Sequence, residues 1–486
     1  MATKLTREDI VGMIARRLPF TPTLGQAGLI RELTSFILHF REDVGFVLTG
    51  YAGTGKTSVV SALVKVLPAL NITPVLLAPT GRAAKVLAAY SGRPAYTIHK
   101  QIYYADEASA TRPDSNFPNS GKGLSLKQNR SRNTLYIVDE ASMIGEEDSL
   151  FFDFFRYVQS GYRCRVLLVG DSAQLPPVGS PYSPALDVDY LASSFPFQFF
   201  SYTLDQVVRQ GKGSLVLENA TLLREKIAEE ENATVRLPLF ALQTHEDMRM
   251  DLQRIDGAEL EDILQKEYSK REREDIVCIT RSNKRANLFN DEIRYRIFGH
   301  ESELVAGDLL MVLKNNYFWL PEGSKAGFIA NGDMIEVMKI KHREELYGFH
   351  FADIEARLVD YPDEPVLEVK VLTEALHVEA ASLPYAQIRE MGEKILEDYP
   401  ELTTQAKRME FLKKNPYFNA LQIKYAYALT CHKTQGGQWP CVFIDQGYFT
   451  EDMLDAEFLR WLYTALTRTV EKAYLLNFAD DFFTEY

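Results

Sequence analysis

The segment Gly50-Tyr-Ala-Gly-Thr-Gly-Lys-Thr57 places glycines, a lysine and a threonine at a spacing suited to phosphate chemistry. It fits the pattern G-x-x-x-x-G-K-[ST], in which glycines let backbone N–H groups curl around phosphate oxygens. Lys56 is expected to reach the β- and γ-phosphates, and the Thr57 hydroxyl to ligate Mg²⁺. The pattern predicts a site for a nucleoside triphosphate, with ATP as the first expectation. The residues expected to bind it in this segment are Gly50, Gly53, Thr54, Gly55, Lys56, Thr57 and Ser58.

A carboxylate pair follows the apolar run Leu135–Val138. Such a run delivers Asp139 to the carboxyl edge of a parallel sheet, where ligands bind. We expect Asp139 to hold Mg²⁺ and Glu140 to orient or deprotonate the attacking water. A strand followed by Asp-Glu also begins ordinary turns and helices, so the pair is weak evidence alone. Downstream of the phosphate-binding segment, it indicates an ATPase.

A third strand end presents Gly170-Asp171-Ser-Ala-Gln174-Leu-Pro-Pro. A simple turn after a strand explains the glycine and the prolines but gives Gln174 no role. An uncharged amide can sense a γ-phosphate by hydrogen bonding. We therefore expect Gln174 to face the nucleotide.

The elements that must position these residues alternate between short apolar runs and helical patterns. Runs too short for a buried helix fit buried strands, and their alternation with helices predicts a parallel sheet. The same alternation returns late in the chain, so we predict two α/β domains. The expected strands are Val44–Thr49, Pro74–Ala78, Leu135–Val138, Val166–Val169, Asp275–Thr280 and Val442–Asp445, with helices at Ser58–Leu67 and Gly81–Tyr90 and from Asn283.

Two segments interrupt this pattern and are interpreted as insertions. Residues 101–133 are rich in Ser, Asn, Gly, Pro and Lys, and their end is basic. Residues 336–420 begin with strand-like stretches, Glu336–Ile340 and Val366–Leu372, and continue into a helical region, Tyr385–Leu412.

Composition narrows the class of protein. The chain has 486 residues, 46% hydrophobic and 25% charged, which is typical of a multi-domain globular protein. No apolar run is long enough for a membrane helix. Three of the four scattered cysteines sit in or beside apolar runs and are expected to be buried thiols, so we expect a cytoplasmic protein. A net charge of −13 argues against a protein that coats nucleic acid over its whole surface, but it allows a locally basic groove.

Motifs in chain order resemble those of superfamily-1B DNA helicases of the RecD-like, Dda-like type, which are P-loop ATPases. The N-terminal half contributes Phe20-Thr-Pro-Thr-Leu-Gly-Gln26, the phosphate-binding segment, Leu77-Ala-Pro-Thr80, Thr97-Ile-His99, Val138-Asp-Glu-Ala and Gly170-Asp-x-x-Gln-Leu-Pro-Pro. The C-terminal half contributes Leu204-Asp-Gln-Val-Val-Arg209-Gln, Tyr427-Ala-Leu-Thr430-Cys-His432-Lys433-Thr-Gln-Gly436 and Trp461-Leu-Tyr463-Thr-Ala-Leu-Thr-Arg468.

The resemblance implies two RecA-like parallel-sheet domains whose interface binds ATP. It implies that Gln26 reads the adenine edge and that Gly436 lines the nucleotide site. Arg209 and Arg468 are implied to be arginine fingers that stabilise the transferring phosphoryl group. The catalytic set is then Lys56, Glu140, Gln174, Arg209 and Arg468, and the metal set is Thr57 and Asp139.

The resemblance also implies a track for single-stranded DNA across both domains and binding of single-strand/duplex junctions. Hydroxyl, amide and backbone donors hold phosphates without reading sequence, and ring faces stack on bases. The implied track consists of Pro79, Thr80, Thr97, His99, Thr280, Asn283, Thr430, His432 and Lys433.

The predicted domains are ATPase domain 1 (1–100 and 134–204), an inserted wedge (101–133), RecA-like domain 2 (205–335 and 421–486) and an inserted accessory domain (336–420). In the wedge, Tyr103, Tyr104 or Phe117 is expected to meet the last base pair. In relatives the accessory domain holds a small barrel, and the helical part here is longer than that pattern predicts.

The leading hypothesis is an ATP-dependent helicase that moves 5′ to 3′ on single-stranded DNA, unwinds duplex as a monomer, and serves repair, recombination or replication. The direction comes from the resemblance alone. The alternatives are a translocase that separates strands poorly and an ATP-dependent switch that binds a protein partner. Nuclease activity is not predicted, since no further carboxylate cluster has the context of a metal site.

Overall fold

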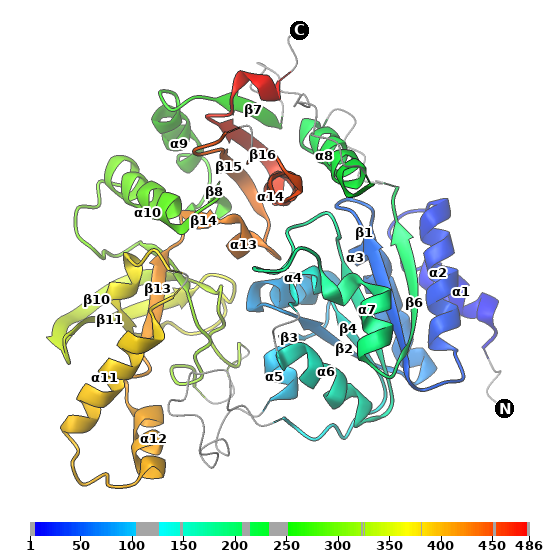
Figure 1. Ribbon diagram of the computed structural model, residues 1–486, viewed down its shortest axis with the longest axis horizontal. Coiled ribbons are helices and arrows are strands. Elements are labelled where there is room, and N and C mark those ends of the chain that lie inside the picture. Colours follow the sequence, from blue (N-terminus) through cyan, green and yellow to red (C-terminus); the bar gives the residue numbers. More distant parts are fainter. Residues whose placement is uncertain are drawn as a thin grey trace.

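The computed structural model describes residues 5–103, 126–145, 149–206, 214–232, 251–321, 324, 326–380, 382–450 and 453–483. Figure 1 shows two α/β units, one formed by the N-terminal part of the chain and one by the C-terminal part, with a strand-rich unit beside them. The predicted fold class, two parallel-sheet domains with a barrel inserted in the second, is confirmed.

The first domain is a parallel sheet with the strand order β3-β2-β4-β5-β1-β6. Its strands are β1 (Val44–Gly50), β2 (Thr73–Ala78), β3 (Ala95–Thr97), β4 (Arg132–Val138), β5 (Tyr162–Gly170) and β6 (Gln198–Leu204). Its helices are α1 (Arg7–Ala15), α2 (Leu24–Ile37), α3 (Lys56–Val66), α4 (Gly81–Ser91), α5 (Ile98–Ile102), α6 (Ser149–Gln159) and α7 (Val188–Ser194). Strands β1, β4 and β5 lie side by side, so the three predicted strand-end motifs meet at one edge of the sheet.

The second domain is a parallel sheet with the order β14-β8-β15-β16-β7. Its strands are β7 (Leu252–Ile255), β8 (Ile276–Thr280), β14 (Ala428–Thr430), β15 (Trp439–Asp445) and β16 (Thr469–Leu476). Its helices are α8 (Leu215–Asn232), α9 (Leu260–Tyr268), α10 (Asn283–Glu292), α13 (Cys431–Thr434) and α14 (Ala456–Leu466). Helix α14 faces the first domain, and α8 packs along it (Figure 1).

A closed barrel in the order β10-β11-β12-β13-β9 separates the two halves of the second domain along the chain. Its strands are β9 (Leu309–Val312), β10 (Met334–Leu346), β11 (Phe349–Leu358), β12 (Leu367–Leu372) and β13 (Leu421–Tyr425). The barrel therefore begins before residue 336 and ends after residue 420. Strands β9 and β13 pair with each other, which spacing along the chain does not reveal.

The helical part of the insertion consists of two helices, α11 (Tyr385–Glu397) and α12 (Gln405–Lys414). They lie beyond one end of the barrel (Figure 1). Ile388, Met391 and Ile395 of α11 pack in one apolar cluster with Phe349 and Phe351 of β11. The long helical stretch is thus a helical cap on the barrel, with its own small core.

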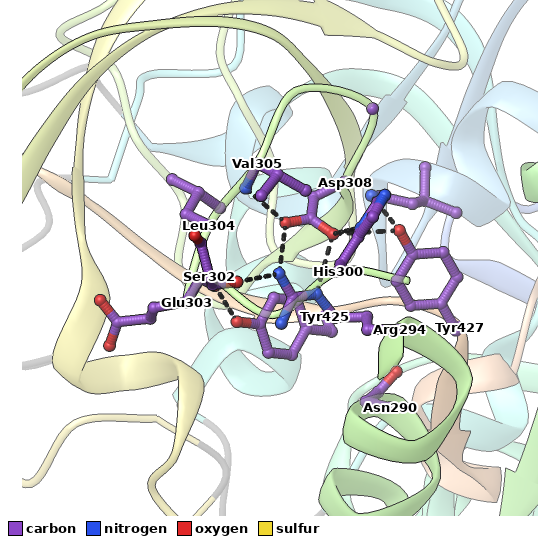
Figure 2. A network of polar contacts seen from close by, with 12 residues as sticks. Asn290, Arg294, His300, Ser302, Glu303, Leu304, Val305, Asp308, Tyr425 and Tyr427 are labelled. Carbon is purple, nitrogen blue, oxygen red and sulfur yellow. Dashed lines mark hydrogen bonds and ion pairs between the residues drawn. The ribbon is translucent and has the colours of Figure 1, made fainter. Parts of the chain in front are cut away.

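A buried polar network joins the barrel to the second domain (Figure 2). The Arg294 guanidinium donates to both carboxylate oxygens of Asp308, each at 2.9 Å, and the Tyr427 hydroxyl donates to the same carboxylate at 3.2 Å. A buried ion pair of this kind is stable only when its remaining polar atoms are also satisfied. The backbone N–H of Val305 and the ring of His300 complete the shell around Asp308.

The cysteines Cys164, Cys278, Cys431 and Cys441 are all free and buried, so burial extends to all four rather than to the expected three. Among the helices of the described ranges, none combines the length and the apolar content that crossing a bilayer requires.

Candidate functional site

The phosphate-binding loop leads from β1 into α3. Gly53 and Gly55 have φ of +76° and +88°, a left-handed backbone that favours glycine. At Gly50 the limit is space, because an added Cβ would lie 2.8 Å from the carbonyl oxygen of Leu204. Each glycine of the pattern therefore has a local reason to be glycine. The loop turns back on itself in front of the N-terminus of α3, the geometry that receives phosphate.

Two polar side chains hold this loop. Lys56 Nζ donates to the carbonyl oxygens of Gly50, at 2.5 Å, and of Tyr51, at 2.9 Å. Gln26 is fully buried and donates from Nε2 to the Thr54 carbonyl at 3.1 Å, while its Oε1 accepts from the Thr23 backbone N–H. The Gln26 amide therefore ties the start of α2 to the loop, and its expected contact with adenine stays a prediction.

Asp139 and Glu140 lie where β4 ends, as the sequence predicts. Burial raises the pKa of Asp139 to about 7, Glu140 beside it adds to the rise, and Lys56 opposes it. Glu140 has φ of +53° and its backbone N–H donates to Asp139 Oδ1 at 3.0 Å, so this strand end is a tight, strained turn. A divalent cation beside the half-buried Asp139 would stabilise the charge of this carboxylate, so Asp139 suits the implied Mg²⁺, and Glu140 lies next to it as the residue expected to act on water.

The loop of residues 171–175, which follows β5, is held from the second domain. The Tyr463 hydroxyl of α14 donates to Asp171 Oδ2 at 2.6 Å, and Thr464 Oγ1 accepts from the Leu175 N–H at 2.9 Å. Gln435 Nε2 donates to the Leu175 carbonyl at 2.8 Å. Arg460 of α14 also donates to the Ser172 carbonyl, so four side chains of one domain hold a single strand-end loop of the other.

Gln174 lies in this loop and is buried at 5% exposure. Its side-chain oxygen has no hydrogen-bond partner among the described residues. Buried amide oxygens are nearly always paired, so an unpaired one marks a position that a ligand could complete. This is consistent with the predicted role of Gln174 as a sensor of γ-phosphate.

Arg468 follows α14 and is 4% exposed. Its guanidinium donates to the carbonyl oxygens of Thr464 and Gly437 and to the Thr467 hydroxyl. No carboxylate pairs with it in the part of the chain that the structure describes. A buried cation without an opposite charge is costly, and an incoming phosphoryl group would supply that charge.

The other predicted finger, Arg209, lies outside the described residues, so its placement stays a prediction. Gly436 has φ of +73°, and an added Cβ would lie 2.7 Å from Cβ of Ala83 in α4. The Gln435–Gly437 turn therefore packs directly against the first domain. Here the structure shows Gly436 as a contact between the domains; its contact with nucleotide stays a prediction.

A groove of about 670 Å³ crosses the interface next to this site. Thr80 lines it from the first domain, and His432 and Lys433 from the second, so three predicted DNA contacts meet in one cavity. The remaining lining includes Arg82, Met143, residues 177–182, Asn331 and Gly332. Val178 and Tyr182 are exposed in it.

The other predicted DNA contacts are not among the residues that line this groove. Asn283 and Thr430 line a second, smaller cavity together with Lys433, and Thr97 lines a third. Pro79 directly precedes Thr80 and is half-buried, as is His99, whose ring lies 5.9 Å from that of Tyr103. Thr280 is fully buried, with its hydroxyl donating to the Ser282 carbonyl. Thr280 is the last residue of β8, and its expected contact with DNA stays a prediction.

Several residues at this interface escaped prediction. Arg224 of α8 lies 4.3 Å from the ring of Tyr51 in the phosphate-binding loop. Lys85 of α4 pairs with Asp333 at 3.0 Å and Asp360 at 3.1 Å, and so connects the first domain to the barrel region. Lys424 Nζ is buried and has no hydrogen-bond partner within the described ranges, and burial, with repulsion from Lys433, lowers its pKa to about 8. Only the i, i+4 spacing of Arg460, Thr464 and Arg468 could have signalled the shared face of α14.

Comparisons with known families agree with this architecture. Residues 25–236 match the model of an AAA domain, and residues 425–476 match a UvrD-like helicase C-terminal domain. The two matched regions hold the phosphate-binding loop and α14, respectively. The site at the first sheet edge is therefore a nucleotide-binding site, and the resemblance to RecD-like superfamily-1B helicases is confirmed.

The chain is 32% identical over 202 residues to the ATP-dependent RecD2 DNA helicase of Deinococcus radiodurans. That match covers 41% of this chain and 24% of the relative, so the chain spans about a quarter of that helicase. It is 24% identical over 481 residues to an uncharacterised protein of Acanthamoeba polyphaga mimivirus, covering 88% of this chain and 94% of the other.

Among solved structures, the chain resembles Pif1 helicases. One, described as unwinding forked double-stranded DNA, has a TM-score of 0.47 at 14% identity, with 96% of this chain and 95% of that chain covered. A Pif1 helicase from Bacteroides in complex with ADP-AlF3 and single-stranded DNA has a TM-score of 0.44 at 13% identity, with the same coverage.

Proposed function

We propose that this chain, which joins an AAA domain to a UvrD-like helicase C-terminal domain, is an ATP-dependent DNA helicase. In this proposal it moves on single-stranded DNA in the 5′ to 3′ direction and unwinds the duplex ahead. The observation that carries the proposal is the interface. A phosphate-binding loop and a buried, uncompensated arginine come from different domains, and a groove with basic side chains lies beside them.

The chemistry is ATP hydrolysis. Lys56 and the loop N–H groups bind the phosphates, and Thr57 and Asp139 would hold Mg²⁺, which would offset negative charge on the phosphates. Glu140 orients or deprotonates water, Gln174 contacts the γ-phosphate, and Arg468 stabilises charge on the transferring group. Because Arg468 belongs to the other domain, the presence of the γ-phosphate favours a closed interface. Hydrolysis removes that preference, and the domains separate.

In this proposal, the groove between the two domains is the binding track for single-stranded DNA. Lys433, Arg82 and His432 provide cationic or hydrogen-bonding contacts to phosphates, and the exposed ring of Tyr182 offers a stacking face for a base. Its walls come from both domains, so opening and closing of the interface changes the spacing between the two sets of DNA contacts. A cycle of ATP binding and hydrolysis would then move the protein along the strand.

The predicted domain bounds belong to this proposal as well. The sheets support two ATPase-type domains, and the barrel with its helical cap is the accessory domain. The proposed wedge at 101–133 includes residues 104–125, which lie outside the described residues. Tyr103, just before that gap, donates from its hydroxyl to Asp153 at 2.8 Å, which anchors the start of the segment on α6.

The decisive experiment for the proposed function is unwinding with defined substrates. We expect ATPase activity that single-stranded DNA stimulates, and strand separation from a forked or partial duplex with a 5′ tail but not a 3′ tail. DNA-stimulated hydrolysis without strand separation would assign the chain as a translocase. Hydrolysis that DNA does not change would instead favour an ATP-dependent switch and overturn the proposal.

Lys433 offers a test of the track. Lys433→Ala should weaken binding of single-stranded DNA and lower the slope of log affinity against log salt by about 0.7, because one phosphate contact is lost. Lys414→Ala is the matched control: it removes the same charge from α12, where Lys414 pairs with Glu410 on an exposed face. Fluorescence anisotropy with labelled oligonucleotides over a salt series measures both. Equal slopes for the two variants would place the DNA elsewhere.

A further inference from the structure

Tyr463 has an unusual position between the two domains. It lies on α14 of the second domain and is 1% exposed, yet its hydroxyl forms hydrogen bonds with two residues of the first domain. Its hydroxyl accepts from the Ala52 backbone N–H at 2.9 Å and donates to Asp171 Oδ2 at 2.6 Å. One oxygen atom of the second domain therefore bridges the phosphate-binding loop and the loop after β5.

The two residues that bond to the Tyr463 hydroxyl belong to different sites, the phosphate-binding loop and the loop that leads to the groove. Ala52 is the third residue of the phosphate-binding segment, between Tyr51, whose carbonyl accepts from Lys56, and Gly53. Asp171 opens the loop that contains Gln174 and continues into residues 177–182, which line the groove. A shift of the groove wall therefore reaches Asp171 through a few residues of backbone. The hydroxyl of Tyr463 contacts both that residue and the nucleotide loop.

The bridge is chemically well defined. Burial, with the nearby Asp171 carboxylate, raises the pKa of the Tyr463 phenol well above its ordinary value, so the hydroxyl keeps its proton and remains a donor. The surrounding contacts support it. Thr464 and Gln435 hold Leu175, and Arg460 of α14 donates to the Ser172 carbonyl. The loop cannot move relative to α14 without disturbing this set.

We propose that Tyr463 is a positioning residue that couples the DNA groove to the nucleotide site through its hydrogen bonds to Ala52 and Asp171. DNA in the groove sets the position of the loop after β5. Because Tyr463 bonds to this loop and to the phosphate-binding loop, a shift of the first loop also moves the second. The same shift moves α14, whose C-terminal end is followed by Arg468. This inference rests on the proposed function. It assigns coupling between two sites to a side chain that need not contact either ligand.

The test removes only the hydroxyl. In Tyr463→Phe, the factor by which single-stranded DNA stimulates kcat should fall about tenfold or more, since hydrogen bonds to charged groups are among the stronger ones. Because coupling between binding sites is reciprocal, the change in DNA affinity on binding a non-hydrolysable ATP analogue should shrink as well. DNA affinity without nucleotide and affinity for ADP should stay within about twofold of wild type, since the groove and the phosphate loop are both retained.

Tyr474→Phe is the matched control. Tyr474 is also fully buried in the second domain, and its hydroxyl donates to a carboxylate, Glu267, at 2.9 Å, but inside its own domain. Both variants should lose similar stability, measured as Tm, and only Tyr463→Phe should lose coupling. If Tyr463→Phe does not fold, Thr464→Val, which frees the Leu175 N–H of the same loop, must show the same loss.

The outcomes distinguish a failure of the proposed function from a failure of the coupling role of Tyr463. Wild-type protein that does not bind single-stranded DNA overturns the proposed function itself. A second outcome overturns only the coupling role of Tyr463. In that outcome the wild-type protein binds DNA and is stimulated by it, and Tyr463→Phe keeps the same stimulation and the same nucleotide-dependent DNA affinity as Tyr474→Phe.

Discussion

Lys56→Ala is expected to reduce ATP hydrolysis by roughly 10³ or more, to background, because it removes the preorganised cation that the phosphates require. In the structure, Lys56 contributes two hydrogen bonds to carbonyl oxygens of its own loop and is only half-buried. Its loss should therefore lower Tm by no more than a few degrees. Phosphate release with saturating single-stranded DNA measures the activity, and differential scanning calorimetry measures Tm.

Lys65→Ala provides the control for this variant. Lys65 is exposed in the last turn of the same helix, α3, so the change in net charge is identical while the phosphate-binding loop is untouched. It should hydrolyse ATP at the wild-type rate. Hydrolysis that survives in Lys56→Ala at more than a few per cent would mean that the loop after β1 is not the catalytic nucleotide site.

Arg468→Ala is expected to leave ATP binding nearly unchanged and to lower turnover by a factor on the order of 10³, the effect of losing an arginine finger. The structure adds a second expectation. Arg468 is buried and has no ionic partner among the residues that the structure describes, so its removal leaves carbonyl acceptors unpaired but strands no carboxylate of those residues. The loss of stability should be modest, about 1–3 kcal/mol. Titration with a fluorescent ATP analogue and single-turnover hydrolysis separate binding from chemistry.

Arg271→Ala is the comparison for Arg468→Ala. Arg271 belongs to the same domain and is mostly buried, but it pairs with Glu471 at 3.0 Å and with Glu267, away from the interface. It should lose stability and keep its turnover at temperatures where it is folded. If Arg468→Ala hydrolyses ATP as fast as Arg271→Ala, the active site is not shared between the two domains.

The strands and the phosphate-binding loop were predictable because their causes are local. Apolar runs such as Val166–Val169 and Val44–Thr49 are short, β-branched and bounded by turn residues, and they occupy β5 and β1 as expected. The extent of the accessory domain was not predictable in the same way. The barrel closes by pairing β9 with β13, and that partner choice depends on curvature of the whole sheet rather than on either strand.

In the candidate site, too, features with local causes were predictable from the sequence and features that depend on distant parts of the chain were not. The residues whose role depends on the chain's own turn, Gly53 and Gly55, sit in the backbone conformation that their positions imply. Residues whose surroundings come from distant parts of the chain are harder to place from the sequence. Thr280 is fully buried at the end of β8, and the Gln26 amide bonds to the phosphate-binding loop, while their expected contacts with DNA and adenine stay predictions. Neither placement can be read from the neighbouring residues, because burial is decided by what packs above them.

The sequence by itself determined that this protein has a nucleotide loop, a carboxylate pair and an amide at three strand ends, since each is a short segment with its own steric and chemical logic. Only the tertiary structure decided how the second domain reaches them. The face of α14 that carries Arg460, Tyr463 and Thr464 is recognisable as a helix face from its spacing, but its target is not. Contacts between domains depend on the relative placement of two sheets, and no local pattern encodes that placement.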